Sequence, residues 1–157
     1  MTSIAQHTNP VWRHKSNFLI QVDLAPFGML ERWEQLWVRQ LGEGSFEVCC
    51  IPFFTYGVAL GDIVSAVVGE RFDYEFRGVV AKSGQLTLRM AVVNRDDASR
   101  LHDRIHAALS STGLAHEWYG TGYVAVSISD DAQKDVIVSA LAPNIDREEV
   151  AIEVDKT

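Results

Sequence analysis

Hydrophobic and polar residues alternate through much of the first half of the chain. The alternation is clearest at residues 70–80, where Phe72, Tyr74 and Phe76 fall on one side and charged residues lie between them. A period of two residues is typical of a β-strand with one buried face. Similar patterns predict strands at residues 17–24, 32–40, 46–51 and 63–68. The first half is therefore expected to be an antiparallel, β-rich unit.

Helical spacing appears in the second half of the chain. Apolar residues spaced three and four apart predict a helix that begins after Asp96 or Asp97 and ends at Gly113. A second helix is predicted between a capping residue, Asp130, and Pro143. Strands are predicted around these helices at residues 86–93, 114–119, 123–129 and 150–154.

The two patterns together predict an α+β protein of two subdomains. Residues 17–83 form the β-rich subdomain, and residues 84–157 follow the β-α-β-β-α-β order of a ferredoxin-like fold. The connection near residues 82–85 is short, so we expect the subdomains to pack together and not to swing on a linker. Residues 1–16 lie outside both, and the sequence permits disorder there.

An aromatic segment joins two of the predicted strands. Residues 51–68 read IPFFTYGVALGDIVSAVV. Pro52 cannot donate a ladder hydrogen bond, so the chain should leave the sheet there, and Gly57 and Gly61 permit tight reversals. Its three aromatic side chains either close the core as a lid, which we favour, or line a ligand pocket; they are Phe53, Phe54 and Tyr56.

Charge and hydropathy narrow the classes of partner. The chain has 14 Lys and Arg against 21 Asp and Glu, a formal net charge of −7. Nucleic acid and anionic membrane are poor partners for such a chain, because little positive charge is available to neutralise phosphates. No signal-peptide pattern begins the sequence, and no run approaches the roughly 18 apolar residues that cross a bilayer. We expect a cytoplasmic protein that meets a basic protein partner.

Patterns that indicate chemistry are sparse. His102 and His106 are four residues apart on a predicted helix, and His116 in the next strand is a third possible metal ligand, but solvated histidines are the favoured interpretation. The turn at residues 120–122 (GTG) has backbone amides that suit a phosphate, yet it lacks the Lys and following helix of a P-loop. We therefore expect no catalytic residue, no metal and no cofactor.

Three segments carry a family resemblance: ERWEQLWVRQLGEGSFEVCCIPFFTYGVALGDIVSAV, VVAKSGQLTLRMAV and HAALSSTGLAHEWYGTGYVAVSI. Over about residues 18–154 the chain resembles the bacterial family called domain of unknown function 4265. The matching positions are Glu34, Leu36, Trp37, residues 51–54, Gly57, Gly61, Asp62, Val64, Ser83, Gly84, Thr87, Arg89 and residues 112–113.

The resemblance implies a function in bacterial competition. Some members of the family resemble immunity proteins that neutralise a neighbouring Rhs-type toxin of the ADP-ribosyltransferase kind. The chain would then be a monomeric or weakly dimeric inhibitor and not an enzyme. It would occlude the NAD-binding or target-binding cleft of the toxin, and the toxin surface that it contacts would be basic. The expected partner-binding residues, chosen for charge and exposure, are Asp73, Glu75, Trp118, Tyr119 and Tyr123.

A small-molecule-binding regulatory module with a ferredoxin-like domain is the alternative. In that case the aromatic residues of the segment at 51–68 would line the ligand pocket.

Overall fold

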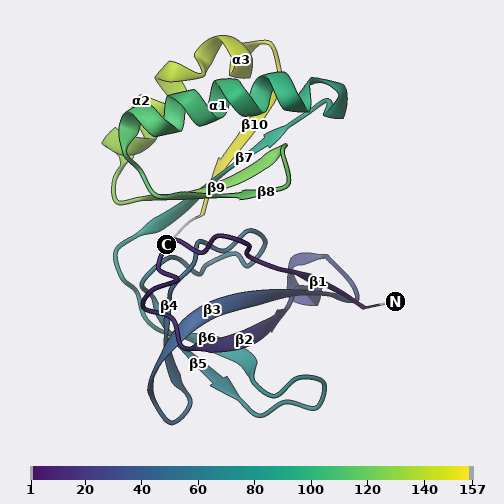
Figure 1. Ribbon diagram of the computed structural model, residues 1–157, viewed down its shortest axis with the longest axis vertical. Coiled ribbons are helices and arrows are strands. Elements are labelled where there is room, and N and C mark those ends of the chain that lie inside the picture. Colours follow the sequence, from purple (N-terminus) through teal and green to yellow (C-terminus); the bar gives the residue numbers. More distant parts are fainter. Residues whose placement is uncertain (1, 156–157) are drawn as a thin grey trace.

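The computed structural model describes residues 2–155. It contains two units stacked along the long axis of the molecule, one built of strands and one in which helices cover a sheet (Figure 1). The first unit holds β1 (Ser3–Ala5), β2 (Phe18–Asp23), a 3-10 helix (Ala25–Phe27), β3 (Arg32–Gly42), β4 (Ser45–Val48), β5 (Ile63–Val67) and β6 (Glu75–Ala81). The second holds β7 (Leu86–Val92), α1 (Ala98–Thr112), β8 (His116–Tyr119), β9 (Tyr123–Ile128), α2 (Asp131–Ala140), α3 (Ala142–Asp146) and β10 (Val150–Val154).

The sheet of the N-terminal unit closes on itself. Its strand order is β1-β3-β2-β6-β5-β4, and β4 also pairs with β3, so five of the strands form a barrel-like ring. Alternate residues point into the ring because successive side chains of a strand face opposite sides. The inward side chains form one buried core of Ile20, Val22, Leu36, Val38, Phe46, Val48, Val64 and Ala66.

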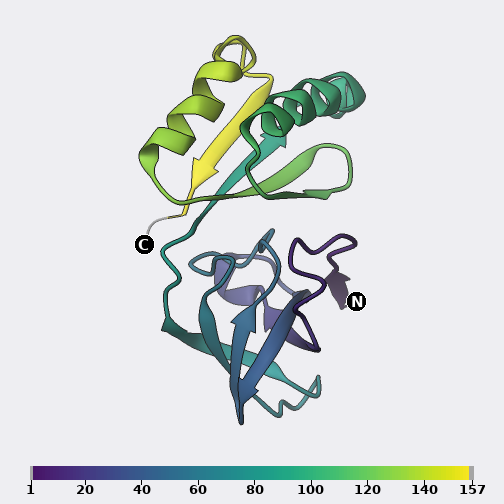
Figure 2. The same cartoon turned by 60° about the vertical axis from the view of Figure 1, so that its left-hand side comes forward.

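The sheet of the C-terminal unit has the strand order β10-β7-β9-β8, and every pairing in it is antiparallel. All three helices cover the face that points away from the N-terminal unit (Figure 2). Their apolar sides pack on Leu88, Met90, Val124 and Val126 of the sheet. The other face of this sheet packs against the N-terminal unit.

The predicted helix ends are largely confirmed. Gly113 lies just past α1 with a φ of 72°, the left-handed conformation that glycine adopts without strain. The side chain of Asp130 accepts a hydrogen bond from the backbone N–H of Gln133 at 2.9 Å and so caps α2. Pro143 does not end the helical region as expected, because it lies in the first turn of α3, where no N–H is needed.

The N-terminal segment has defined structure, although the sequence permits disorder there. β1 pairs in parallel with β3, and Ala5 and His7 are almost completely buried. The segment is held in place because the His7 side chain lies between the two units and bonds to both of them.

The strand predicted at residues 70–80 starts later than expected, at Glu75. The Glu75 carboxylate accepts hydrogen bonds from the backbone N–H groups of Arg71 and Phe72 at 3.0 and 2.9 Å, which folds the preceding residues into a loop. The strand predicted at residues 70–74 was therefore wrong, although the residues there alternate.

Candidate functional site

A buried loop lies between the two units. β4 ends at Val48, three residues before the predicted strand end at residue 51, and residues 49–60 then run under the open face of the C-terminal sheet. Ile51, Phe53 and Leu60 from this loop pack with Ala125 of β9. Loops are rarely buried, because every backbone N–H and C=O without a partner costs free energy. The side chains that satisfy this loop define a polar buried site between the two units.

Glu34, on β3, satisfies the amide groups of the loop. Its carboxylate is fully buried and accepts hydrogen bonds from the N–H groups of Phe53 (2.7 Å), Phe54 (3.0 Å) and Thr55 (2.9 Å). The Thr55 hydroxyl (2.7 Å) and a ring nitrogen of His7 (2.8 Å) complete the set. One carboxylate from the N-terminal unit thus fixes three consecutive residues of the loop.

His7 joins this carboxylate to a second one from the other unit. Its Nε2 lies 2.8 Å from Glu34 and its Nδ1 lies 2.7 Å from Glu117 on β8. Two carboxylate partners require both ring nitrogens to donate, which makes the ring an imidazolium. Glu117 also accepts from the N–H groups of Ile51 at 2.7 Å and Val11 at 3.3 Å. The ring lies flat against Phe53, with centroids 4.1 Å apart.

The pKa shifts agree with this charge assignment. Burial opposes a charge on His7, but interactions with Cys50, Glu117 and Glu34 outweigh it and raise the pKa of the imidazole well above its usual value. Burial also opposes the charge on Glu34, yet hydrogen bonds from His7 and the loop lower the pKa of its carboxyl. The pKa of the Cys50 thiol is raised by burial, although His7 acts against that shift. The site therefore holds a charged imidazole between two carboxylates.

Arg89, on β7, satisfies the carbonyl groups of the same loop. It is buried and donates to the carbonyls of Pro52 (3.1 Å), Phe53 (2.7 Å) and Thr55 (3.1 Å). The guanidinium is also paired with Asp155 just past β10. Donors and acceptors from both units therefore hold one short stretch of backbone.

A further buried carboxylate fixes the end of the loop. Asp62 accepts from the Ala59 N–H at 2.9 Å, the Ser83 N–H at 2.8 Å and the Lys82 ammonium at 2.7 Å. Gly57 and Gly61 have φ angles of 82° and 84°, as the predicted reversals require. The connection between the units is thus tied to the loop.

The buried cluster is better suited to holding the two units together than to catalysis. Cys50, His7 and Glu34 are the residue types of a cysteine nucleophile with its base and orienting group, but all three are buried. Every carboxylate oxygen in the cluster is occupied by protein donors. Substrate would have to displace the loop to reach them.

The aromatic residues of the loop have different roles. Phe53 is buried and Phe54 is half-buried between the units, as expected for a lid, whereas Tyr56 is 42% exposed and its hydroxyl donates to Glu153. Phe54 packs against Tyr119 and Tyr123 of the C-terminal sheet. The lid therefore closes the junction between the two units.

The expected partner-binding residues do not form one surface. Asp73 is exposed on the loop before β6, whereas Glu75 is half-buried and holds that loop. The expectation of an exposed hairpin was wrong for Tyr119 and Tyr123, which are half-buried. The Tyr119 hydroxyl accepts from Arg32 at 2.7 Å, and the Tyr123 hydroxyl donates to the Phe53 carbonyl at 2.6 Å.

Trp118 lies on the opposite face of the same hairpin. It is half-buried against the helix-covered core, and its ring centroid is 4.0 Å from that of His102. The physical reason is strand alternation, because neighbouring residues of β8 point to opposite faces. Trp118 and the two tyrosines therefore cannot contact one flat partner surface together.

The three histidines considered as metal ligands do come together. The ring centroids of His102 and His106 are 5.9 Å apart, and those of His106 and His116 are 5.8 Å apart. Within residues 2–155, however, no three His, Cys, Asp or Glu side chains are grouped so that they could hold a metal ion.

Sequence reasoning missed the role of the buried polar residues. Glu34 and Arg89 were named for the family resemblance alone, and His7 and Glu117 were not considered. One signal was available, because Glu34 alternates with Leu36 and Val38 and must share their inward face. Nothing in the sequence indicates that His7 returns to meet it.

The fold and the buried loop define a class: an α+β protein in which two sheets hold one polar loop between them. The family model called domain of unknown function (DUF4265) matches residues 34–152. The chain belongs to this family.

A solved structure shares the fold. The chain is 19% identical to a hypothetical protein from Neisseria gonorrhoeae, with a TM-score of 0.65 over 86% of this chain and 91% of that one. A search of curated proteins found no match. Between residues 2 and 155, no helix combines the length and the apolar character needed to span a bilayer.

Proposed function

We propose that this protein is an immunity protein that neutralises a cognate antibacterial toxin of the ADP-ribosyltransferase kind by binding and not by chemistry. One observation carries the proposal: the residues best suited to catalysis are buried and hold two units together. What remains for function is a rigid exterior on a chain with a net charge of −7. Such a surface favours a basic partner, since complementary charge steers association.

The loop before β6 is the part of the predicted interface that suits a docking surface. Asp73 is exposed there, next to exposed Glu70, and the Glu75 carboxylate fixes the backbone beneath them. A preformed acidic loop binds without a large loss of conformational entropy. Trp118 would belong to a separate contact, because it lies at the edge of the other unit.

Cytoplasmic location, a monomeric or weakly dimeric state and the absence of enzyme activity are parts of the same proposal. A stoichiometric inhibitor of this kind would bury on the order of 1,600 Å² in the complex. Occlusion of the NAD-binding or target-binding cleft of the toxin is the simplest mode of inhibition for a rigid protein.

The C-terminal unit is interpreted as ferredoxin-like. Its element order and its strand order of β10-β7-β9-β8 support this interpretation. Because ferredoxin-like units serve many functions, this fold favours neither inhibition nor regulation by itself.

Co-expression with a candidate toxin encoded by a neighbouring gene tests the proposal. The intact chain should restore growth. When binding to the toxin is measured, Asp73→Lys should lower the association rate constant on the order of threefold to tenfold. Asp135→Lys, an exposed change of the same charge on α2, is the matched control and should keep full protection. Growth arrest in the presence of the intact, soluble chain would contradict the proposal.

A further inference from the structure

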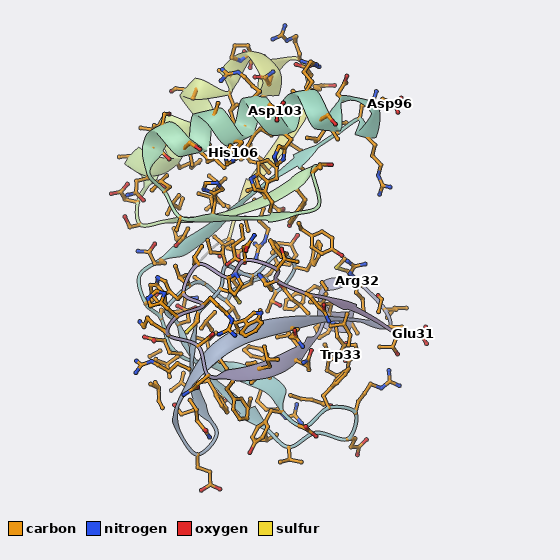
Figure 3. All side chains as sticks on the ribbon, viewed as in Figure 1. Glu31, Arg32, Trp33, Asp96, Asp103 and His106 are labelled. Atoms are coloured by element: carbon orange, nitrogen blue, oxygen red, sulfur yellow. The ribbon has the colours of Figure 1, made fainter. Side chains whose placement is uncertain are left out.

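A hollow of about 490 Å³ lies beside the turn at residues 120–122. It falls within the roughly 300–1,000 Å³ that is usual for small-ligand sites. Its lining comes from the end of β7, the start of α1 and the β8–β9 hairpin. In Figure 3 the label of Asp96 marks the short 3-10 helix (Arg95–Asp97) that precedes α1, and Arg32, which contacts Tyr119 of this lining, is labelled on the unit below.

The hollow carries one cationic side chain without a partner. Arg95 lines it, is exposed, and forms no side-chain hydrogen bond or ion pair within residues 2–155. Arg39, Arg89 and Arg100, by contrast, each face a carboxylate. A free guanidinium at a concave surface favours an anionic ligand.

Two hydroxyl groups add neutral donors to the same lining. The oxygen of Tyr119 accepts from Arg32, which leaves the hydroxyl hydrogen for another acceptor. Thr121 is exposed at the tip of the turn, and its carbonyl lies 3.2 Å from His102 Nδ1, so the turn is attached to α1. No carboxylate is part of the lining.

The remaining lining is apolar and close to an aromatic ring. Ala91 and Ala98 are small, so they leave room above the sheet, and Tyr123 forms the side of the hollow. The Tyr123 ring is held by its hydrogen bond to Phe53 and by stacking on Phe54, with centroids 5.2 Å apart. A fixed ring beside small residues suits a flat ligand group.

We propose that this hollow binds a small molecule that combines a flat ring with a phosphate or carboxylate group. The anionic group contacts Arg95 and the hydroxyls of Thr121 and Tyr119, and the ring lies against Tyr123 above the two alanines. The inference goes beyond toxin neutralisation and does not depend on it, because the acidic loop before β6 belongs to the other unit.

Calorimetric titration of the full chain tests the proposal with three probes. Adenosine monophosphate and 4-hydroxyphenylpyruvate represent the phosphate and carboxylate sources, and uncharged adenosine is the control. We expect saturable binding of one of the two anions and at least tenfold weaker binding of adenosine, since adenosine cannot form a charge-assisted hydrogen bond with Arg95. Failure of both anions to bind at millimolar concentration would overturn the proposal.

Matched variants locate the binding. Arg95→Ala should weaken binding of the preferred anion by about tenfold or more. Arg100→Ala removes the same charge one turn further along the chain, where the side chain pairs with Glu149 outside the hollow, and should leave the affinity unchanged. Ala98→Leu should also weaken binding because it fills the space. Equal affinity in Arg95→Ala and the unaltered chain would overturn the assignment.

Discussion

The molecule places histidine in two contrasting environments. His7 is buried between two carboxylates from different units, whereas His102, His106 and His116 lie together at the border of α1 and β8, where their rings contact one another. The surface group has the sequence spacing of a metal site, and the buried one has no sequence signal at all. The comparison shows that the contacts formed in the fold, and not spacing along the chain, decide which histidine joins the two units.

The largest effect is expected from Glu34→Ala. The change leaves the His7 imidazolium and three amide groups of the buried loop without their acceptor. Removal of one partner from a buried ion pair costs about 3–5 kcal/mol, so the free energy of unfolding in urea should fall by about 4 kcal/mol. Because the loop is held from both units, the two sheets should also lose their fixed packing.

Glu43→Ala is the control for this prediction. Glu43 lies in the exposed turn between β3 and β4, so its removal should change the unfolding free energy by less than about 0.5 kcal/mol. If both variants proved equally stable, the buried cluster would not be what joins the two units.

A smaller effect is expected from pH, and its sign follows from His7. The folded-state pKa of His7 is raised, so its contribution to stability is complete below the unfolded value of about 6.5 and is lost as pH rises through the folded value. Glu34, with a lowered pKa, acts in the opposite sense and contributes above its ordinary value. Urea unfolding should therefore show a maximum of stability in mildly acidic solution and a decline from about pH 6.5 upward.

The His7→Gln variant separates this effect from other titrations. Its stability should be lower by about 3 kcal/mol near pH 6, and the decline between pH 6.5 and 8.5 should be absent. Above about pH 8.5, titration of unfolded thiol groups would add a further decline because the Cys50 pKa is raised in the fold. A wild-type profile that stays flat from pH 5 to 8.5 would show that the pKa of His7 is the same in the folded and unfolded states, and would contradict this prediction.

Local pattern predicted most of the secondary structure. The strands at residues 17–24, 32–40 and 63–68 and the cap at Asp130 depend on alternation and on hydrogen bonds to near neighbours, which the sequence contains. The strand predicted from residue 70 failed because Glu75 turns back to bond the two residues that should have extended it. A carboxylate that folds back in this way looks in the sequence like a carboxylate on the solvated face of a strand. The residue types alone therefore do not distinguish the two structures.

The buried site could not be predicted in the same way. His7 meets Glu117 across 110 positions of the chain, and Arg89 reaches the Phe53 carbonyl across 36. Each contact exists only because the loop after β4 lies between two sheets. A charged residue in the inward register of a strand, such as Glu34, is the one signal that local reasoning can use, because burial then demands partners.

The smallest effect is expected at the surface histidines. The double change His102→Ala with His106→Ala removes a ring contact with Trp118 but no buried charge, so the unfolding free energy should change by less than about 1 kcal/mol. Addition of Zn²⁺ should leave the melting temperature of the unaltered chain where it is, because a group that cannot hold the ion gains no stability from it. A zinc-dependent rise in melting temperature that the double variant lacks would reverse the comparison. The surface histidines would then be a ligand site, and the spacing of four residues would have been the right signal.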